Sequence, residues 1–229
     1  KCVMFFKIYC NITYIMIKYN KHMFGDDTME KIIFHVDATQ AIGKVNLDFK
    51  NIDFKFLEGY PYYFAGDSVY DGVMQYYEEF TKARRSGKND IRHLLIIDEY
   101  PAFLNYLQTK DKTHEKEVMA AVSEILMLGR GIKFGSLITT QRSDSAWFAN
   151  GARDNFQVIC ALGRLSKEQK SMCFPGLETN DTYIFSKGEG ILLADGKPLK
   201  YVKFPVIDTE AFKKNIEHIL MSNTDTEEK

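Results

Sequence analysis

The apolar residues of this chain fall into two patterns: short continuous runs, and longer stretches in which they recur every three or four positions. Four mainly apolar runs without an Asp, Glu, Lys or Arg predict buried strands, because a strand covered on both faces is apolar along most of its length: 32–36, 94–97, 134–140 and 158–162. Helical spacing predicts four helices, at about 69–83, 114–128, 167–173 and 209–221. Residues 188–204 predict a hairpin with Asp195-Gly196 as its turn. Strands that alternate with helices indicate an α/β domain with a mainly parallel sheet.

The first thirty residues are apolar and aromatic but show no clear period, so they predict a strand or a helix without deciding between them. Lys7, Asn11 and Lys18 interrupt this stretch. No run in it reaches the roughly 18 apolar residues that a membrane-spanning helix needs. We therefore do not expect a transmembrane segment here.

The amino-acid composition excludes several classes of protein. With 45% hydrophobic residues the chain can bury a substantial core, so global disorder is not expected. The net charge of −1 gives no general basic field of the kind that marks a nucleic-acid coat protein, although a few basic residues on loops can still contact DNA. The cysteines at 2, 10, 160 and 173 form no C-x-x-C pair, which indicates reduced thiols and neither a disulfide framework nor a zinc site.

Two carboxylates, Asp98 and Glu99, follow directly on the apolar run 94–97, which is the pattern called Walker B. A buried parallel strand delivers such residues to its carboxyl end, where α/β sheets bind their ligands. Asp98 would there hold the Mg²⁺ ion of ATP, often through water, and Glu99 would polarise the attacking water. Acidic residues also end many ordinary strands. From this hexapeptide alone, a solvated strand end without function is an equally good interpretation.

Two further motifs follow in order. Gln141 ends the strand predicted at 134–140, where it can sense the γ-phosphate or orient the attacking water. Arg130 lies in G-R-G-I at 129–132, ahead of that strand, and Arg153 lies in N-G-A-R-D-N-F at 150–156, ahead of the next. A surface salt bridge is an equally open interpretation of each arginine.

The order of these motifs resembles the FtsK/HerA family of DNA-translocating ATPases, and above all the coupling ATPases of conjugative elements in Gram-positive bacteria. The resemblance extends over about 53–204 and includes F-L-E-G-Y at 56–60 and G-E-G-I-L-L-A-D-G at 188–196. It covers the C-terminal half of such an ATPase domain. It therefore implies part of a P-loop NTPase (RecA-like) fold, followed by a β-hairpin and a helix.

The resemblance implies ATP-dependent translocation of double-stranded DNA, without sequence readout, in conjugative transfer or in chromosome or plasmid segregation. ATP and Mg²⁺ are the implied cofactors, with Asp98 at the metal, Glu99 and Gln141 at the nucleotide, and Arg130 or Arg153 as an arginine finger toward a neighbouring subunit. The implied partners are DNA, the other subunits of a six-membered ring, and relaxosome or segregation proteins. The implied location is cytoplasmic, with a membrane tether in the parent protein.

Five basic residues are candidates for contacting DNA phosphates in the ring channel, although a solvated surface charge is the favoured interpretation of each: Lys82, Arg84, Arg85, Arg142 and Lys167.

The Gly-rich phosphate loop of such ATPases, G-x-x-x-x-G-K-[ST], does not occur in the 229 residues. Gly43-Lys44 lacks both the upstream glycine and the following Ser or Thr. We therefore expect the chain to bind ATP weakly or not at all. A sheet without the strand that leads into this loop is also expected to expose an edge.

A second resemblance covers only 31–54. The string F-H-V-D-A-T-Q-A-I-G-K at 34–44 is similar to the cofactor segment of cysteine desulfurases of the class V aminotransferase fold. It implies that Asp37 would pair with the pyridine nitrogen of pyridoxal phosphate and Gln40 with the ring hydroxyl. The Schiff-base lysine expected about two dozen residues later is absent, since the chain reads G-Y-P-Y-Y at 59–63. Pyridoxal catalysis is therefore not expected, and ordinary strand-end residues are the simpler interpretation.

The two resemblances divide the chain into an N-terminal segment of foreign origin at 1–52, an FtsK/HerA-like portion at 53–222 and a disordered tail at 223–229. Three functions stay open: part of a DNA-pumping ATPase, a non-catalytic interaction fragment, and, remotely, a desulfurase fragment. ATP-dependent ring assembly would separate the first two. A yellow, pyridoxal-containing protein would mark the third.

Overall fold

The computed structural model describes a large part of the chain. These residues are 3–6, 34–37, 54–60, 62–89, 92–141, 144–176, 184–186, 188–194, 196–204, 208, 210–211 and 213–214.

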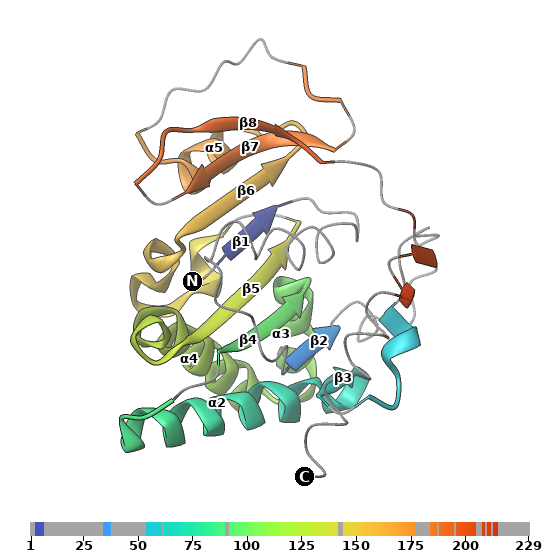
Figure 1. The fold of residues 1–229 in the computed structure, drawn as a ribbon, viewed down its shortest axis with the longest axis vertical. Coiled ribbons are helices and arrows are strands. Elements are labelled where there is room, and N and C mark those ends of the chain that lie inside the picture. Colours follow the sequence, from blue (N-terminus) through green and yellow to red (C-terminus); the bar gives the residue numbers. More distant parts are fainter. Residues whose placement is uncertain are drawn as a thin grey trace.

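The described strands form one eight-stranded sheet in the order β3-β2-β4-β5-β1-β6-β7-β8, which runs from bottom to top in Figure 1. Their bounds are β1 Val3–Phe6, β2 Phe34–Asp37, β3 Tyr63–Ala65, β4 His93–Asp98, β5 Phe134–Thr140, β6 Val158–Leu162, β7 Glu189–Ala194 and β8 Lys200–Lys203. Every pairing from β3 to β6 is parallel, and the pairings of β6 with β7 and of β7 with β8 are antiparallel. The predicted mainly parallel α/β sheet with a C-terminal hairpin is confirmed.

The helices and 3-10 turns connect these strands. Their bounds are α2 Val69–Ser86, α3 Tyr100–Lys110, α4 Lys112–Leu128, α5 Lys167–Cys173, η2 Phe54–Leu57, η3 Gly66–Ser68, η4 Gly129–Ile132, η5 Ser145–Trp147 and η6 Ala149–Asn155. None of the helices in the described part of the chain has the length and apolar character needed to cross a membrane. Of the helix predicted at 209–221, only four residues at 210–214 are described, and they are helical; the tail at 223–229 lies outside the described residues.

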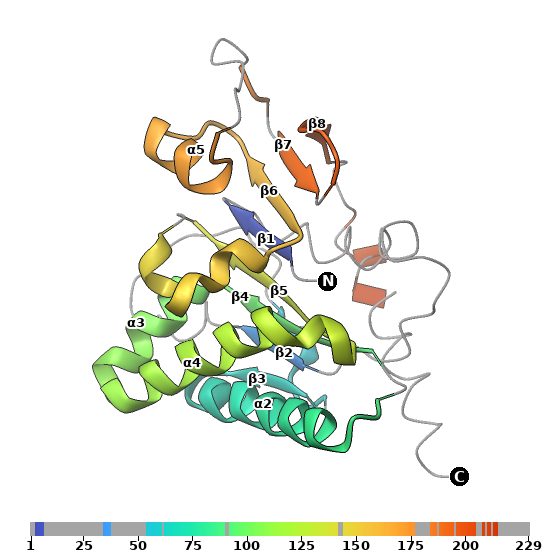
Figure 2. The same ribbon diagram turned by 90° about the vertical axis from the view of Figure 1, so that its left-hand side faces the viewer.

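The main hydrophobic core lies between one face of the sheet and the helices. Figures 1 and 2 show α2 and α4 side by side along this face. Residues of β4 and β5 such as Leu95 and Ile138 share one buried cluster with residues of these helices such as Phe80 and Val122. A smaller cluster of strand residues, including Ile96 and Leu137, occupies the other face, as the alternation of side chains along a strand requires.

Strand β1 lies in the middle of the sheet, between β5 and β6. Its four residues pair in parallel with both neighbours, so that Phe6 is level with Thr140 on one side and with Ala161 on the other. β5 and β6 are therefore not edge strands, because β1 supplies backbone hydrogen-bonding partners to both, and the edges of the sheet are β3 and β8. β1 and β2 both come from the segment at 1–52 and belong to the same sheet as the rest.

Helix α2 begins and ends close to where its sequence predicts. Ser68 precedes its first turn, but the Ser68 hydroxyl donates to the carbonyl of Ala65 (3.0 Å) and makes no hydrogen bond to an amide of α2. At the other end Gly87 adopts a left-handed conformation with φ 65°, and its amide donates to the carbonyl of Ala83. Glycine tolerates this conformation without steric cost, which explains why the helix ends here.

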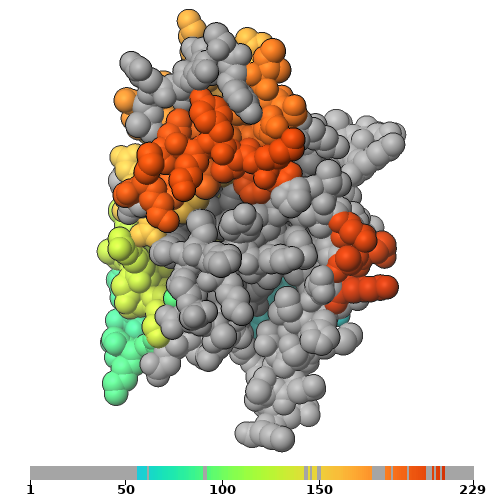
Figure 3. All heavy atoms as spheres, turned by 45° about the horizontal axis from the view of Figure 1, so that its top comes forward, coloured from blue at the N-terminus to red at the C-terminus, as the bar shows by residue number. Residues whose placement is uncertain are grey.

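The outer edge of the sheet is β8, whose residues lie together at the surface in Figure 3. Gly196 has a positive φ of 69° and lies in the turn of the hairpin, where the Lys197 amide donates to Ala194. Lys200 and Lys203 are both exposed on β8. Charged lysines on an edge strand discourage pairing with another sheet.

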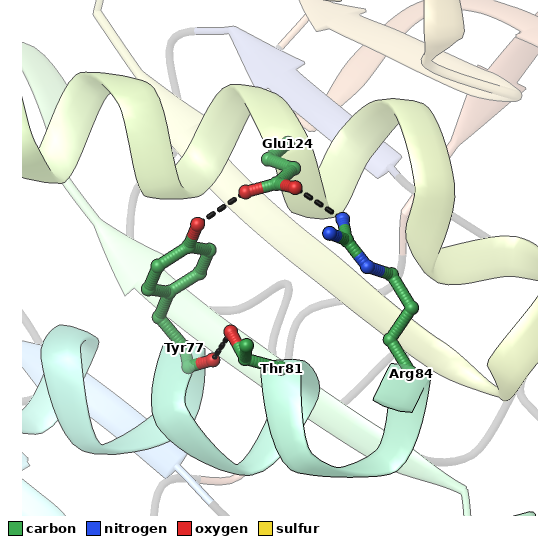
Figure 4. Close-up of polar contacts among 4 residues, drawn as sticks. All are labelled: Tyr77, Thr81, Arg84 and Glu124. Atoms are coloured by element: carbon green, nitrogen blue, oxygen red, sulfur yellow. Dashed lines mark hydrogen bonds and ion pairs between the residues drawn. The ribbon is translucent and has the colours of Figure 1, made fainter. Parts of the chain in front are cut away.

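Two tyrosines of α2 donate hydrogen bonds to two glutamates of α4. The tyrosines are seven residues apart on α2, and the glutamates are seven residues apart on α4. Tyr70 donates to Glu117 at 2.5 Å, and Tyr77 donates to Glu124, which also accepts from Arg84 (Figure 4). The bond to Glu117, together with burial, raises the pKa of Tyr70 to about 12. The bond from Tyr77 lowers the pKa of Glu124 below its ordinary value, and Arg84 acts in the same direction. These contacts fix the relative position of two helices under the sheet.

Replacing Tyr77 with phenylalanine is expected to lower the free energy of unfolding at pH 7 by about 1 kcal/mol, because Glu124 loses a charge-assisted hydrogen bond while the ring packing is kept. The loss should shrink as the pH falls below 4.5, the ordinary pKa of a glutamate. A lowered carboxyl pKa contributes stability that is present above the unfolded value and disappears as the native carboxylate is protonated. Urea unfolding at pH 7 and pH 3.5 measures both effects. Tyr60→Phe is the matched control, since the half-buried Tyr60 hydroxyl has no hydrogen bond within the described residues. An equal loss in both variants would contradict the prediction.

Candidate nucleotide site at the carboxyl edge of the sheet

Asp98 and Glu99 leave the sheet at the carboxyl end of β4. Asp98 is half-buried, and Glu99 is 9% exposed. Glu99 has φ 53° and ψ 54°, the left-handed region, and forms the N-cap of α3, where its carbonyl accepts from the Phe103 amide at 3.1 Å. Pro101 fits the first turn of α3, which has no amide partner to lose. A non-glycine residue in the left-handed region costs about 1–3 kcal/mol and is typical of functional sites.

Thr139 of β5 connects these two residues. Its hydroxyl donates to Asp98 Oδ1 at 2.5 Å and accepts from the Glu99 amide at 2.8 Å. The sequence analysis did not single out Thr139. The alternation along β5 contains the signal, because Thr139 shares a face with Leu137 and Gln141 and is therefore on the same side of the sheet as Asp98.

Gln141 follows β5 and hydrogen-bonds to the Glu99 carboxyl group. Burial, followed by the negative charge of Asp98, raises the pKa of Glu99 to about 7, while the bond from Gln141 acts in the opposite direction. A carboxyl group with this pKa can accept a proton near neutral pH, which is what a general base requires. The structure therefore brings together three of the predicted site residues: Asp98, Glu99 and Gln141.

The two predicted arginines do not contact this group within the described residues. Arg130 is exposed in η4, ahead of the amino end of β5. β5 has seven residues and so spans about 20 Å, which separates Arg130 from the carboxyl edge of its own chain. Arg153 lies in η6, which packs against α4 and precedes the amino end of β6, and its Nε is 3.7 Å from Asp154. Both arginines stay candidates for reaching a neighbouring subunit.

Strand β2 ends at the same edge. Asp37 ends β2 and is in register with Asp98, so the predicted position of Asp37 at a strand end is confirmed. Gln40, Gly43 and Lys44 lie outside the described residues. Within the described residues, no group of three His, Cys, Asp or Glu side chains could hold a metal ion. Mg²⁺ commonly takes only one or two carboxylates and completes its shell with water and phosphate oxygens, so Asp98 suits such an ion only together with a nucleotide.

Two of the basic candidates for DNA contact are already paired in this chain. Arg84 bonds to Glu124 as described, and Lys82 lies 2.8 Å from Glu78. Arg142 lies outside the described residues. Exposed pairs of this kind are weak and leave the lysine able to exchange partners.

Comparison with known proteins gives one curated relative and several solved structures. The FtsK domain-containing protein YdcQ of Bacillus subtilis is 28% identical over 127 residues, which is 52% of this chain and 25% of YdcQ. The pCW3 conjugation coupling protein TcpA, solved with ATPγS, superimposes with a TM-score of 0.60 at 13% identity, over 94% of this chain and 64% of TcpA. The cytoplasmic domain of the type VII secretion ATPase EccC of Thermomonospora curvata gives 0.54 at 14% identity, over 94% of this chain and 27% of EccC. No family model matches the sequence.

The predicted resemblance to FtsK/HerA-type ATPases is confirmed by the match to YdcQ, and the solved structures confirm the P-loop NTPase fold class. The chain spans only a quarter of the length of YdcQ. The cysteine desulfurase resemblance of 31–54 and the division of the chain at 52 stay predictions.

Proposed function

Because this chain resembles the FtsK-type ATPases, we propose that it contains the metal-binding and water-activating half of the ATP site of a DNA-translocating motor. The observation that carries the proposal is the group formed by Asp98, Glu99 and Gln141, which two neighbouring parallel strands hold at one edge of the sheet. This edge is where α/β sheets bind nucleotides.

Each residue has a role that its position supports. Asp98 would hold Mg²⁺, whose charge neutralises the oxygens of the phosphate chain when it is bound. Glu99, with its raised pKa, would accept a proton from the attacking water. The Gln141 amide, bonded to Glu99, would hold this carboxyl group in one orientation and respond to the γ-phosphate. Arg130 and Arg153 are the two candidates for contacting a neighbouring subunit's nucleotide.

The phosphate-binding half of such a site has no counterpart in the sequence. The 229 residues contain no G-x-x-x-x-G-K-[ST] string, the loop whose backbone amides and lysine would hold the triphosphate beside Asp98. We therefore propose that this polypeptide has weak or no ATPase activity by itself, although the motif residues of the ancestral ATPase are kept.

The purified chain is expected to bind Mg-ATP with a dissociation constant above about 1 mM, which corresponds to less than about 4 kcal/mol of binding free energy. Isothermal titration calorimetry at pH 7.5 measures this. An FtsK-type ATPase with an intact phosphate loop serves as the positive control in the same buffer. Micromolar binding by this chain would contradict the proposal that the phosphate-binding half is missing.

We also propose the partners that the family resemblance implies. These are double-stranded DNA contacted through its phosphates, further subunits in a ring of six, and relaxosome or segregation proteins, all in the cytoplasm beside a membrane-tethered parent protein. The name of TcpA, a conjugation coupling protein, supports the choice of conjugative transfer. Contacts to phosphates alone predict DNA binding that weakens steeply with salt.

A non-catalytic interaction fragment is the second candidate, and the missing phosphate loop favours it. In that case the chain would dock on intact ATPase subunits without turning over ATP. Sedimentation velocity with and without Mg-ATP separates the candidates, since only a functional motor subunit should assemble into rings in response to nucleotide. A colourless preparation would exclude the remote desulfurase alternative.

A further inference from the structure

Thr139 is 5% exposed, and its hydroxyl group both donates and accepts a hydrogen bond within the site. The single proton of this hydroxyl goes to Asp98 Oδ1, and an oxygen lone pair accepts the Glu99 amide. Both bonds cross from β5 to the carboxyl end of β4, where the chain leaves the sheet. One side chain thus contacts the two residues that carry the chemistry of the proposed site.

We propose that Thr139 is the positioning residue of this site: its hydroxyl fixes the orientation of the Asp98 carboxylate and holds the Glu99 backbone in its left-handed conformation. The importance of this for catalysis rests on the proposed ATPase function. The positioning itself is a property of the folded chain without nucleotide.

The consequence for Asp98 follows from its two oxygens. Because Oδ1 accepts the Thr139 hydroxyl at 2.5 Å, the Asp98 carboxylate is held in one orientation about χ2, with Oδ1 toward β5. A carboxylate free to rotate about χ2 would instead present either oxygen. Thr139 thereby selects the orientation of the metal ligand before the ion arrives, and preorganised ligands lose less entropy on binding.

The consequence for Glu99 follows from its backbone. With φ 53° the residue occupies a region that L-residues other than Asn, Asp and Gly rarely adopt. Such a conformation persists only where surrounding contacts determine it. Hydrogen bonds hold Glu99 on both sides of its α-carbon. Its amide donates to Thr139 Oγ1, and its carbonyl accepts from the Phe103 amide. Together they set the direction in which the Glu99 side chain leaves the backbone.

An ordinary β-branched strand residue is the competing interpretation of Thr139. Valine has the same shape and suits a strand equally well, so it keeps the packing and removes only the hydroxyl. Serine keeps the hydroxyl and removes a methyl group. Ser136 of the same strand provides the matched control, because its buried hydroxyl has no hydrogen-bond partner within the described residues.

The test measures amide hydrogen exchange at Glu99 and the ¹³C shift of the Asp98 carboxyl group in the full 229-residue chain at pH 7. Thr139→Val is expected to speed exchange at Glu99 at least tenfold and to shift the Asp98 signal. Thr139→Ser and Ser136→Ala are expected to keep the parent values. If the valine variant does not unfold cooperatively, Thr139→Ala is measured in its place.

Unchanged Glu99 exchange and an unchanged Asp98 signal in the variant without the hydroxyl would overturn the proposal. Failure of the serine variant to keep the parent values would overturn it too, because packing and not the hydroxyl would then be decisive. Neither measurement involves ATP. Micromolar Mg-ATP binding by the purified chain would therefore contradict the proposed function and leave the positioning role of Thr139 standing.

Discussion

At pH 8 the Glu99→Gln variant is expected to be more stable than the parent chain by about 3 kcal/mol, whereas at pH 5 the two should differ by less than about 1 kcal/mol. Burial and the neighbouring Asp98 raise the pKa of Glu99 from 4.5 to about 7 in the folded chain. Glutamine has nearly the same shape, carries no charge, and can still hydrogen-bond to Gln141. It therefore removes the cost of burying a carboxylate and keeps the packing.

The direction of this stability difference follows from proton binding to Glu99. The native Glu99 carboxyl group holds its proton more tightly than the unfolded one, so its contribution to stability is present below pH 4.5 and is lost as the pH rises through about 7. Other titrating groups are common to both proteins and cancel in the difference. Urea unfolding of the two proteins at pH 5, 6.5 and 8 measures the difference in their free energies of unfolding.

Glu78→Gln is the matched control, because Glu78 is an exposed carboxylate on α2. That variant should stay within about 0.5 kcal/mol of the parent at each pH. Two results would show that the buried charge of Glu99 does not destabilise the fold. One is a Glu99→Gln variant that is less stable than the parent at pH 8. The other is a difference in the free energy of unfolding that is the same at pH 5 and pH 8.

The sequence predicted the bounds of those elements whose own residues carry the signal. The strands at Phe134–Thr140 and Val158–Leu162 and the helix at Lys167–Cys173 have the predicted bounds. Val158–Leu162 is an uninterrupted apolar run, and Phe134–Thr140 contains only apolar and small uncharged residues and ends where Gln141 begins. In the helix, Ser166 caps the first turn and bonds to the Gln169 amide, a signal that is visible in the sequence.

Elements that depend on distant contacts were not predictable in the same way. The position of β1 between β5 and β6 depends on pairing with residues more than 130 positions away, and no local period marks it. Helix α3 was not predicted, although Pro101 lies in its first turn, where proline is tolerated. The site itself was predicted in part: sequence order placed Asp98, Glu99 and Gln141 together, but not Thr139.

Joining a phosphate loop to this chain is expected to restore ATP hydrolysis, and Glu99→Gln is then expected to lower its rate by roughly 10²–10⁴-fold. The chimera replaces residues 1–52 with the matching half of an FtsK-type ATPase that contains G-x-x-x-x-G-K-[ST]. Glutamine cannot accept the proton of the attacking water, while ATP binding depends on the phosphate loop and should change little. A phosphate-release assay gives kcat and KM, and Glu78→Gln is again the control.

The pH profile provides an independent check of the same residue. Since the pKa of Glu99 is about 7, the rate of the chimera should rise between pH 6 and pH 8, and the remaining rate of Glu99→Gln should not follow that rise. A chimera that hydrolyses ATP equally fast with glutamine would exclude Glu99 as the base. If both predictions hold, a single buried carboxylate lowers the stability of the fold above pH 7 and supplies the reactivity of the site, which is the trade-off expected where a charge is buried for chemistry and not for stability.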